Sequence, residues 1–272
     1  MLDILKFVIL GAAAGSVLAL LGIGVNVIYR ASRVMNFSQA AIAVSAAYLY
    51  SDFVKVTSVW VALPLALVSG LLIGALIEIL IMRPLKNGSS LTKAIATIGV
   101  LLVLQAILNI RYGYNPILVS PWLPSESVTF LGMTMGLDRY LTILIVVAIT
   151  TAVYLFFKKS PIGLASTALS VNPRALAALG TQSPNVVSLV NWMISGVLAA
   201  IAGLLLAPVT SLAPTLALVL VVPVLSVALL GNLQSFWLTL VGGLFIGIAQ
   251  ALISISIDLP GVQDAVPFLV IA

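Results

Sequence analysis

The segment VILGAAAGSVLALLGIGVNVI, residues 8–28, contains no charged side chain and only two polar ones, Ser16 and Asn26. About 20 apolar residues in an α-helix are enough to cross the hydrocarbon core of a bilayer. This segment therefore predicts a membrane-spanning helix close to the N-terminus.

Seven further runs without a charged residue follow along the chain. They are Phe37 to Ser51, Val56 to Ile77, Ala94 to Ile110, Tyr140 to Phe157, Val186 to Ala207, Leu216 to Leu230 and Phe236 to Ile257. We expect an all-α fold, a polytopic integral membrane bundle of about eight transmembrane helices in a single domain over residues 1–272. The apolar run Val266 to Ala272 is too short to span, so we expect the last helix to be truncated here.

Three of these runs are short. Phe37 to Ser51 and Ala94 to Ile110 are either tilted spans or re-entrant segments, and we favour spans. Leu216 to Leu230 also contains Pro223, which favours a broken helix. Broken helices survive in membranes where they are enclosed by protein or line a polar cavity, so this region is a candidate for a solute path.

The composition excludes several classes of function. The chain is 62% hydrophobic and 7% charged, which cannot supply the surface of a water-soluble domain. It has no cysteine and no histidine, so the commonest metal sites and imidazole bases are excluded. No P-loop motif occurs, and we expect no enzymatic site and no cofactor bound by this chain. The basic residues are scattered rather than clustered, which argues against nucleic acid as a partner.

Basic residues gather on one side of the predicted spans. Eight of the twelve fall there: Arg30, Arg33, Arg83, Lys86, Lys93, Lys158, Lys159 and Arg174. The opposite side receives Lys6, Lys55, Arg111 and Arg139. Loops rich in lysine and arginine face the cytoplasm, so we expect the N-terminus outside.

Glycines and one carboxylate stand out inside the predicted spans. The pairs Gly11/Gly15, Gly70/Gly74 and Gly243/Gly247 have the spacing that allows close helix packing in lipid, and we expect packing to be their main role. Glu78 lies near the inner end of its span, one turn before Arg83, and we expect an interfacial ion pair or a snorkelling role for it.

Uncharged polar side chains at depth are candidates for a solute path. Amides and hydroxyls can bond a zwitterionic solute without the desolvation cost of a charge, although each of them can equally join helices. The candidates for the translocation path are Asn36, Phe37, Ser38, Gln39, Thr97, Gln105 and Asn191.

Two connections are long enough to have structure of their own. The outer one, residues 112–139, contains a turn at Gly132 to Gly136 and either caps the path, offers a docking surface to an external partner, or is an ordered cap alone. The inner one, residues 158–184, has apolar residues at helical spacing and predicts short amphipathic helices ending at Gly180. It is either a surface on which a partner acts or an interfacial helix in contact with membrane lipid.

Four stretches carry a resemblance to a known family. They are Ile28 to Ser38 (IYRASRVMNFS), Ile95 to Gly99 (IATIG), Pro161 to Gly180, and Ser195 to Gly231. In this order they resemble the permease subunits of branched-chain amino acid ABC transporters, and the likeness covers essentially the whole chain.

The resemblance implies an importer in a bacterial plasma (inner) membrane. Its partners would be a second permease subunit, homologous or identical, two cytoplasmic ATPase subunits that use ATP and Mg²⁺, and an extracytoplasmic solute-binding protein. It also implies that the inner loop couples the permease to the ATPase. The residues so implicated are Gly163, Leu164, Ala168, Asn172, Arg174, Leu179 and Gly180.

Two other classes of function stay open from the sequence. The first is an ion-coupled secondary carrier or a facilitative channel. A coupled carrier usually places a carboxylate near the middle of the membrane, and this chain has none there, which counts against the coupled version. A membrane scaffold that transports nothing is the second.

Overall fold

The computed structural model describes residues 2–130, 133–171, 183–256 and 261–271. Six helices are long and apolar enough to cross a membrane. They are α1 (Leu2–Ser32), α3 (Val59–Ile77) with its π-helical extension η1 (Glu78–Met82), α4 (Ser90–Tyr112), α5 (Leu137–Lys159), α8 (Pro184–Leu206) and α11 (Phe236–Ser256). The chain is therefore a multi-pass helical membrane protein, as expected.

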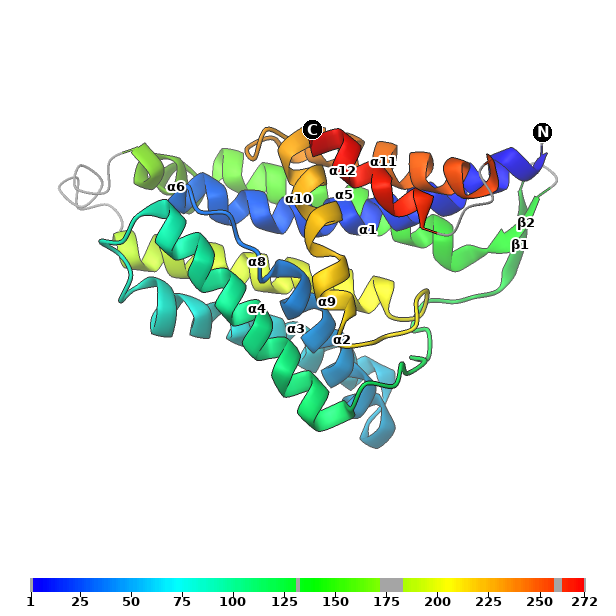
Figure 1. The fold of residues 1–272 in the computed structure, drawn as a ribbon, viewed down its shortest axis with the longest axis horizontal. Helices are drawn as coiled ribbons and strands as arrows, with labels where there is room; N and C mark the ends of the chain where they lie inside the picture. The colour runs from blue at the N-terminus through cyan, green and yellow to red at the C-terminus, as the bar shows by residue number, and fades with distance from the viewer. Residues whose placement is uncertain (1, 131–132, 172–182, 257–260, 272) are drawn as a thin grey trace.

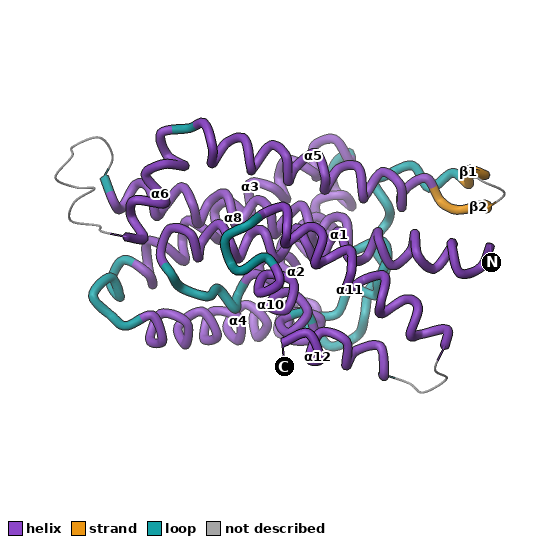
Figure 2. The backbone as a smooth tube through the Cα atoms, turned by 90° about the horizontal axis from the view of Figure 1, so that it is seen from above, coloured by secondary structure: helices purple, strands orange, loops and turns teal. Residues whose placement is uncertain are grey.

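Helix α8 lies in the middle of the bundle. In Figure 1, α1, α5 and α11 occupy the upper half and α2, α3 and α4 the lower half, with α8 between them. Helix α1 is the most enclosed of the six, since 72% of its apolar segment is buried, against 28% for α4 and for α5. Figure 2 shows the same bundle from above, with the long helices running side by side.

The other two predicted spans are helical but shorter. The run Phe37 to Ser51 forms α2 (Gln39–Val56), and nearly all of its residues up to Ser51 are buried inside the protein. The run Leu216 to Leu230 is interrupted at Leu220 and forms α9 (Leu216–Val219) and α10 (Val221–Leu230), so the expected break is confirmed. Among the described residues six helices have the length and hydropathy of a span, so the expected count of eight is not confirmed.

The outer connection contains a small sheet that the sequence did not predict. Strands β1 (Ser127–Phe130) and β2 (Met133–Gly136) pair antiparallel, with Ser127 opposite Gly136. The expected turn at Gly132 to Gly136 is therefore wrong for its last four residues, which belong to a strand. The chain described at the other terminus ends in the short helices η2 (Val262–Ala265) and α12 (Val266–Ile271).

Glycine faces bring helix backbones into direct contact, as expected. A Cβ atom added at Gly11 of α1 would lie 2.5 Å from the carbonyl oxygen of Gly247 in α11, and one added at Gly70 of α3 would lie 2.5 Å from that of Gly196 in α8. Such distances exclude any side chain, so glycine is required at these crossings. The pairs α1–α11 and α3–α8 are the most extensively packed helix pairs in the described chain.

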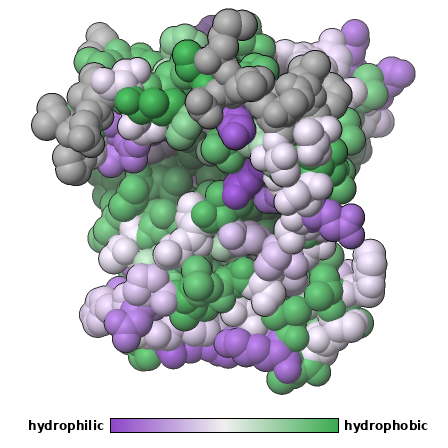
Figure 3. Space-filling model, turned by 90° about the vertical axis from the view of Figure 1, so that its right-hand side faces the viewer, coloured by the Kyte–Doolittle hydropathy of each residue, from purple (hydrophilic) through white to green (hydrophobic). Residues whose placement is uncertain are grey.

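The two ends of the bundle differ in charge. The end of α1, the start of α4 and the end of α5 lie on the same side of the bundle, which we call the basic end. The described basic residues at this end are Arg30, Arg33, Arg83, Lys86, Lys93, Lys158 and Lys159. The opposite side carries β1 and β2 and is called the hairpin end. Figure 3 looks onto the hairpin end and shows hydrophilic and hydrophobic residues mixed around a hollow.

We predict that Gly15→Ala lowers the stability of the protein by about 1–3 kcal/mol, because the new methyl group would collide with the backbone of Gly243. The matched control is Gly99→Ala on α4, where nothing lies within 4 Å of the added carbon. Thermal unfolding of the purified variants in detergent measures both. Equal unfolding temperatures for the two variants would contradict the packing role.

Candidate functional site

A buried cluster of polar side chains lies between the end of α1 and the start of α2. Asn36 accepts hydrogen bonds from the backbone N–H of Ser38 at 3.0 Å and from its hydroxyl at 2.7 Å, and donates to Gln39 Oε1 at 3.0 Å. All three residues are at most 1% exposed. The short Asn-Phe-Ser-Gln sequence therefore folds as a self-bonded turn that opens α2.

Helix α8 completes this cluster. Gln39 Nε2 donates to the backbone carbonyl of Ser195 at 3.0 Å. The Ser195 hydroxyl lies 2.8 Å from Gln39 Oε1 and 2.9 Å from the carbonyl of Gly24 in α1. Because Gly24 has no side chain, the Gln39 amide fills the space beside it. The cluster thus joins α1, α2 and α8 at one point.

Helix α4 contributes two of the candidate residues. Thr97 accepts a hydrogen bond from the backbone N–H of Phe37 at 3.0 Å, which ties the opening of α2 to α4. Gln105 lies two turns further along the same helix, buried, and has no hydrogen-bond partner among the described residues. An amide without a hydrogen-bond partner in the protein can bond a polar solute.

Asn191 lies apart from the other candidates. Its amide donates to the hydroxyl of Ser166 in α6 (Pro161–Val171) at 2.8 Å and to the carbonyl of Val187 at 2.7 Å. In the structure Asn191 attaches α6 to α8, and its place on the solute path stays a prediction. Asn191 and Ser195 are four residues apart, so they lie on one face of α8.

Helix α6 has one face on the bundle and one face exposed. Gly163 lies against the backbone of Phe157, where any side chain would collide, and Leu169 packs with Ala165 and Val187. Leu164 is 66% exposed and Val171 76%, with Ala168 exposed between them. These three residues share the outer face at helical spacing. Asn172, Arg174, Leu179 and Gly180 lie outside the described residues.

Arg30 connects α6 to α1, α5 and α11. Its guanidinium lies over the rings of Phe236, 5.1 Å from the centroid, and Phe157, 5.6 Å from the centroid, within the range of a cation–π interaction. It also lies 3.5 Å from the hydroxyl of Thr167. Arg30 of α1, packed on Phe157 of α5 and Phe236 of α11, therefore contacts the inner loop at Thr167.

A cavity of about 670 Å³ opens at the basic end. It is bounded by the ends of α1 and α6, the start of α8, η1 and the segment leading into α4, and four basic side chains line it: Arg33, Arg83, Lys86 and Lys93. Glu78 also lines it and is 3% exposed. The expected ion pair of Glu78 with Arg83 is not formed, since the ion pairs among the described residues involve only Asp52 and Asp138.

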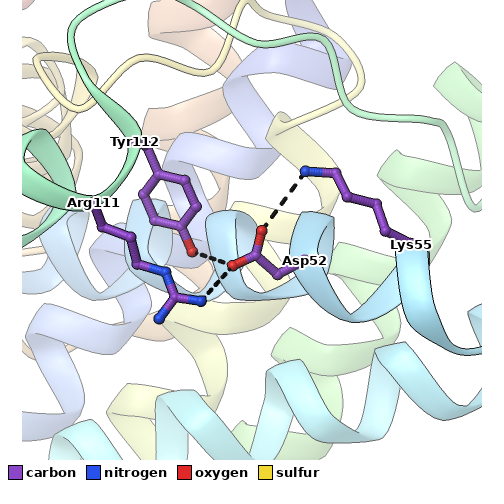
Figure 4. A network of polar contacts seen from close by, with 4 residues as sticks. All are labelled: Asp52, Lys55, Arg111 and Tyr112. Atoms are coloured by element: carbon purple, nitrogen blue, oxygen red, sulfur yellow. Dashed lines mark hydrogen bonds and ion pairs between the residues drawn. The ribbon is translucent and has the colours of Figure 1, made fainter.

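A network of charged and polar groups lies at the hairpin end (Figure 4). The carboxylate of Asp52 accepts hydrogen bonds from Arg111 at 2.8 Å and from Tyr112 at 2.6 Å, with Lys55 at 3.6 Å. Partial burial acts to raise the pKa of Asp52, but the hydrogen bonds from Tyr112 and Arg111 and the charges of Arg111 and Lys55 outweigh it, so the pKa lies below its ordinary value. The network therefore stabilises the α2–α4 contact above the ordinary pKa of an aspartate.

The outer connection is fixed to the bundle. The backbone of Ile117 pairs with that of Leu212, and Trp122 donates to the carbonyl of Leu204 at 2.9 Å. In its described residues the outer connection is therefore packed against the bundle at the hairpin end.

Comparison with known proteins gives the family. Residues 7–272 match the profile of the family described as branched-chain amino acid transport system / permease component. The chain belongs to this permease family. No solved structure matches the permease.

Curated relatives match most of the chain. The permease is 27% identical over 261 residues to the probable branched-chain amino acid transport permease protein LivH of Methanocaldococcus jannaschii, covering 92% of this chain and 81% of the relative. It is 24% identical over 260 residues to the high-affinity branched-chain amino acid transport system permease protein LivH of Escherichia coli K12, covering 90% and 84%. The high-affinity branched-chain amino acid transport system permease protein BraD of Pseudomonas aeruginosa is 24% identical over 258 residues, covering 89% and 83%.

The structure brings together most, but not all, of the predicted path residues. Asn36, Phe37, Ser38, Gln39 and Thr97 meet in one cluster. Sequence reasoning missed two serines. The hydroxyl of Ser195 connects α8 to this cluster, and the hydroxyl of Ser166 connects α6 to α8. Serine is too common in apolar helices to be singled out, although the spacing of Asn191 and Ser195 by four residues was a usable signal.

We predict that Gln39→Ala lowers the stability of the permease by about 1–3 kcal/mol, because the buried carbonyl of Ser195 and the amide of Asn36 would lose their partner. Gln105→Ala is the matched control, since it removes an equally large amide that bonds no described residue. Unfolding temperatures in detergent distinguish them, and a larger loss for Gln105→Ala would show that the cluster is not as described.

Proposed function

We propose that this chain is the membrane-embedded permease subunit of an ATP-binding cassette importer for branched-chain or similar small amino acids. It forms the translocation path and is powered by separate ATPase subunits. The observation that carries the proposal is the direct connection, through one face of α8, between the exposed helix α6 and the buried cluster at the start of α2.

The partners follow from this proposal. A second permease subunit, homologous or identical, completes the path. Two cytoplasmic ATPase subunits that use ATP and Mg²⁺ act at the basic end, and an extracytoplasmic solute-binding protein delivers the solute at the hairpin end. The excess of lysine and arginine supports a cytoplasmic position for the basic end, and with it an external N-terminus in a bacterial inner membrane.

The exposed face of α6 is the proposed surface for the ATPase. Leu164, Ala168 and Val171 form an apolar stripe that the protein leaves uncovered, beside the basic end. A short helix of this kind docks in an apolar groove of its partner. The ATPase would then move α6 as it binds and releases nucleotide.

Movement of α6 reaches the solute path in two steps. Ser166 transmits it to Asn191 through their hydrogen bond, and α8 carries it as a rigid helix over one turn to Ser195. There the single hydroxyl proton of Ser195 lies between two acceptors, Gln39 Oε1 and the carbonyl of Gly24. A shift of α8 exchanges these bonds and frees the amides at the start of α2 for the solute.

Transport by the reconstituted complex tests the proposal. The chain is co-expressed with candidate ATPase, second permease and binding-protein subunits, and uptake of radiolabelled leucine is measured in proteoliposomes. The proposal predicts uptake that requires internal ATP and the external binding protein. Uptake that proceeds without any ATPase, or that follows an imposed ion gradient, would overturn it in favour of a carrier or channel.

We predict that Ser166→Ala lowers the leucine transported per ATP hydrolysed by about threefold or more, because α6 loses its bond to Asn191. Ser170→Ala is the matched control on the same helix, since the Ser170 hydroxyl bonds only the carbonyl of Thr167 within α6. Uptake and phosphate release are measured on the same vesicles. Equal coupling ratios for the two variants would contradict the path through Asn191.

A further inference from the structure

The cavity at the basic end combines features that the coupling role of the inner loop does not explain. Its volume of about 670 Å³ exceeds what one amino acid needs. It is lined both by charged groups of opposite sign and by apolar side chains, including Met82, Leu169 and Trp192. Neither an interface with lipid nor a docking surface requires this combination in a cavity that is open to one side.

Glu78 is the acidic group of the cavity. It is 3% exposed, and its Oε2 atom has no hydrogen-bond partner, although Ser188 bonds the same carboxyl group. A buried carboxylate oxygen without a partner costs free energy, so its retention needs an explanation. A cationic group that enters the cavity would supply the missing partner.

Four basic groups stand around the same cavity. Arg83 has a buried Nε atom without a partner, and Arg33, Lys86 and Lys93 also line the space. None of the four forms an ion pair within the described part of the chain. Lys93 already donates to the carbonyl of Lys86 at 3.0 Å, and Arg33 lies over the ring of Tyr29. Arg83 and Lys86 are therefore the donors most available to an anionic group.

The charges select among ligands. A simple anion would have to place its charge near Glu78, and a simple cation would have to lie among four positive side chains. A zwitterion with its ammonium toward Glu78 and its carboxylate toward the basic groups satisfies both signs. The apolar wall of Trp192, Met82 and Leu169 then receives a hydrocarbon side chain.

We infer that this cavity is a binding site for a free apolar amino acid, held as a zwitterion between Glu78 and the basic groups. The inference rests on the proposed function and deepens it, since it assigns the solute a second position at the end of the path, apart from the cluster at the start of α2. The cavity opens at the basic end, on the side of the membrane to which the amino acid is delivered. Amino acid that accumulates on that side therefore rebinds in the cavity and slows further transport.

Binding to the intact complex tests the site. The nucleotide-free complex in nanodiscs, without the binding protein, is titrated calorimetrically with L-leucine, with L-leucinamide, which lacks the carboxylate, and with 4-methylpentanoate, which lacks the ammonium. We expect L-leucine to bind at least tenfold more tightly than either analogue, because each analogue loses one charge-assisted contact. Equal binding of all three, or no binding of L-leucine at millimolar concentration, would overturn the inference.

Substitutions locate the site. Glu78→Gln should weaken L-leucine binding about tenfold or more and leave 4-methylpentanoate binding unchanged or stronger, because only the ammonium contact is lost. Asp52→Asn at the hairpin end is the matched control and should leave both affinities unchanged. An L-leucine affinity that Glu78→Gln does not change would place the ligand elsewhere and overturn the assignment. If Glu78→Gln does not fold, the three ligands on the unaltered complex decide alone.

The outcome is separable from that of the proposed function. ATP-dependent leucine uptake together with no binding in the cavity would refute the site and leave the importer standing. Absence of leucine uptake by the complete complex would refute the importer, whatever the cavity binds.

Discussion

The fold depends on the direct contact of helix backbones at glycine. In lipid, apolar side chains gain nothing by leaving one apolar surface for another, so helices associate where their backbones approach closely. Gly15 and Gly243 join α1 to α11, Gly70 and Gly196 join α3 to α8, and Gly203 of α8 lies against the backbone of Ala43 in α2. These glycine crossings fall into two groups, α1 with α11 and α2 with α3 and α8, and α1 also packs along α8.

Between the two groups the contacts are of another kind. The hydroxyl of Ser195 reaches across to the carbonyl of Gly24, and the rest of its bonding remains within its own group. A hydrogen bond of this type can exchange partners at low net cost, whereas a glycine crossing cannot shift without collision. The glycine crossings thus fix the helices within each group, whereas α1 and α8 meet through side chains and the bond from Ser195 to Gly24, and α6 is fastened through Asn191 to α8.

The sequence predicted the features that depend on local pattern. The length of the runs without a charged residue predicted the long helices, and the spacing of the glycine pairs predicted where the helices cross. The predicted count of eight spans is not confirmed, since α2 is enclosed by protein and the run Leu216 to Leu230 is broken, and length alone cannot tell enclosure from lipid. The sequence also predicted for Glu78 an ion pair with Arg83 or a snorkelling role, from the separation of the two residues along the chain, whereas the structure has a π-helical η1 here, packed against α8, and forms no such ion pair among the described residues. The path candidates could be recognised as polar side chains within apolar runs. Their partner Ser195 could not, because it comes close to them only in the folded protein.

Because the chain contains no cysteine, paired spin labels can be placed on it directly. The most direct measurement is the distance between labels on the two groups, at Leu72→Cys in α3 and Phe245→Cys in α11, both exposed in the structure. The pair Leu72→Cys and Val186→Cys, within the α3–α8 group, is the control. The account predicts that ATP binding to the complex changes the first distance and leaves the second unchanged. A change within the α3–α8 pair, or no change in either distance during active transport, would contradict it.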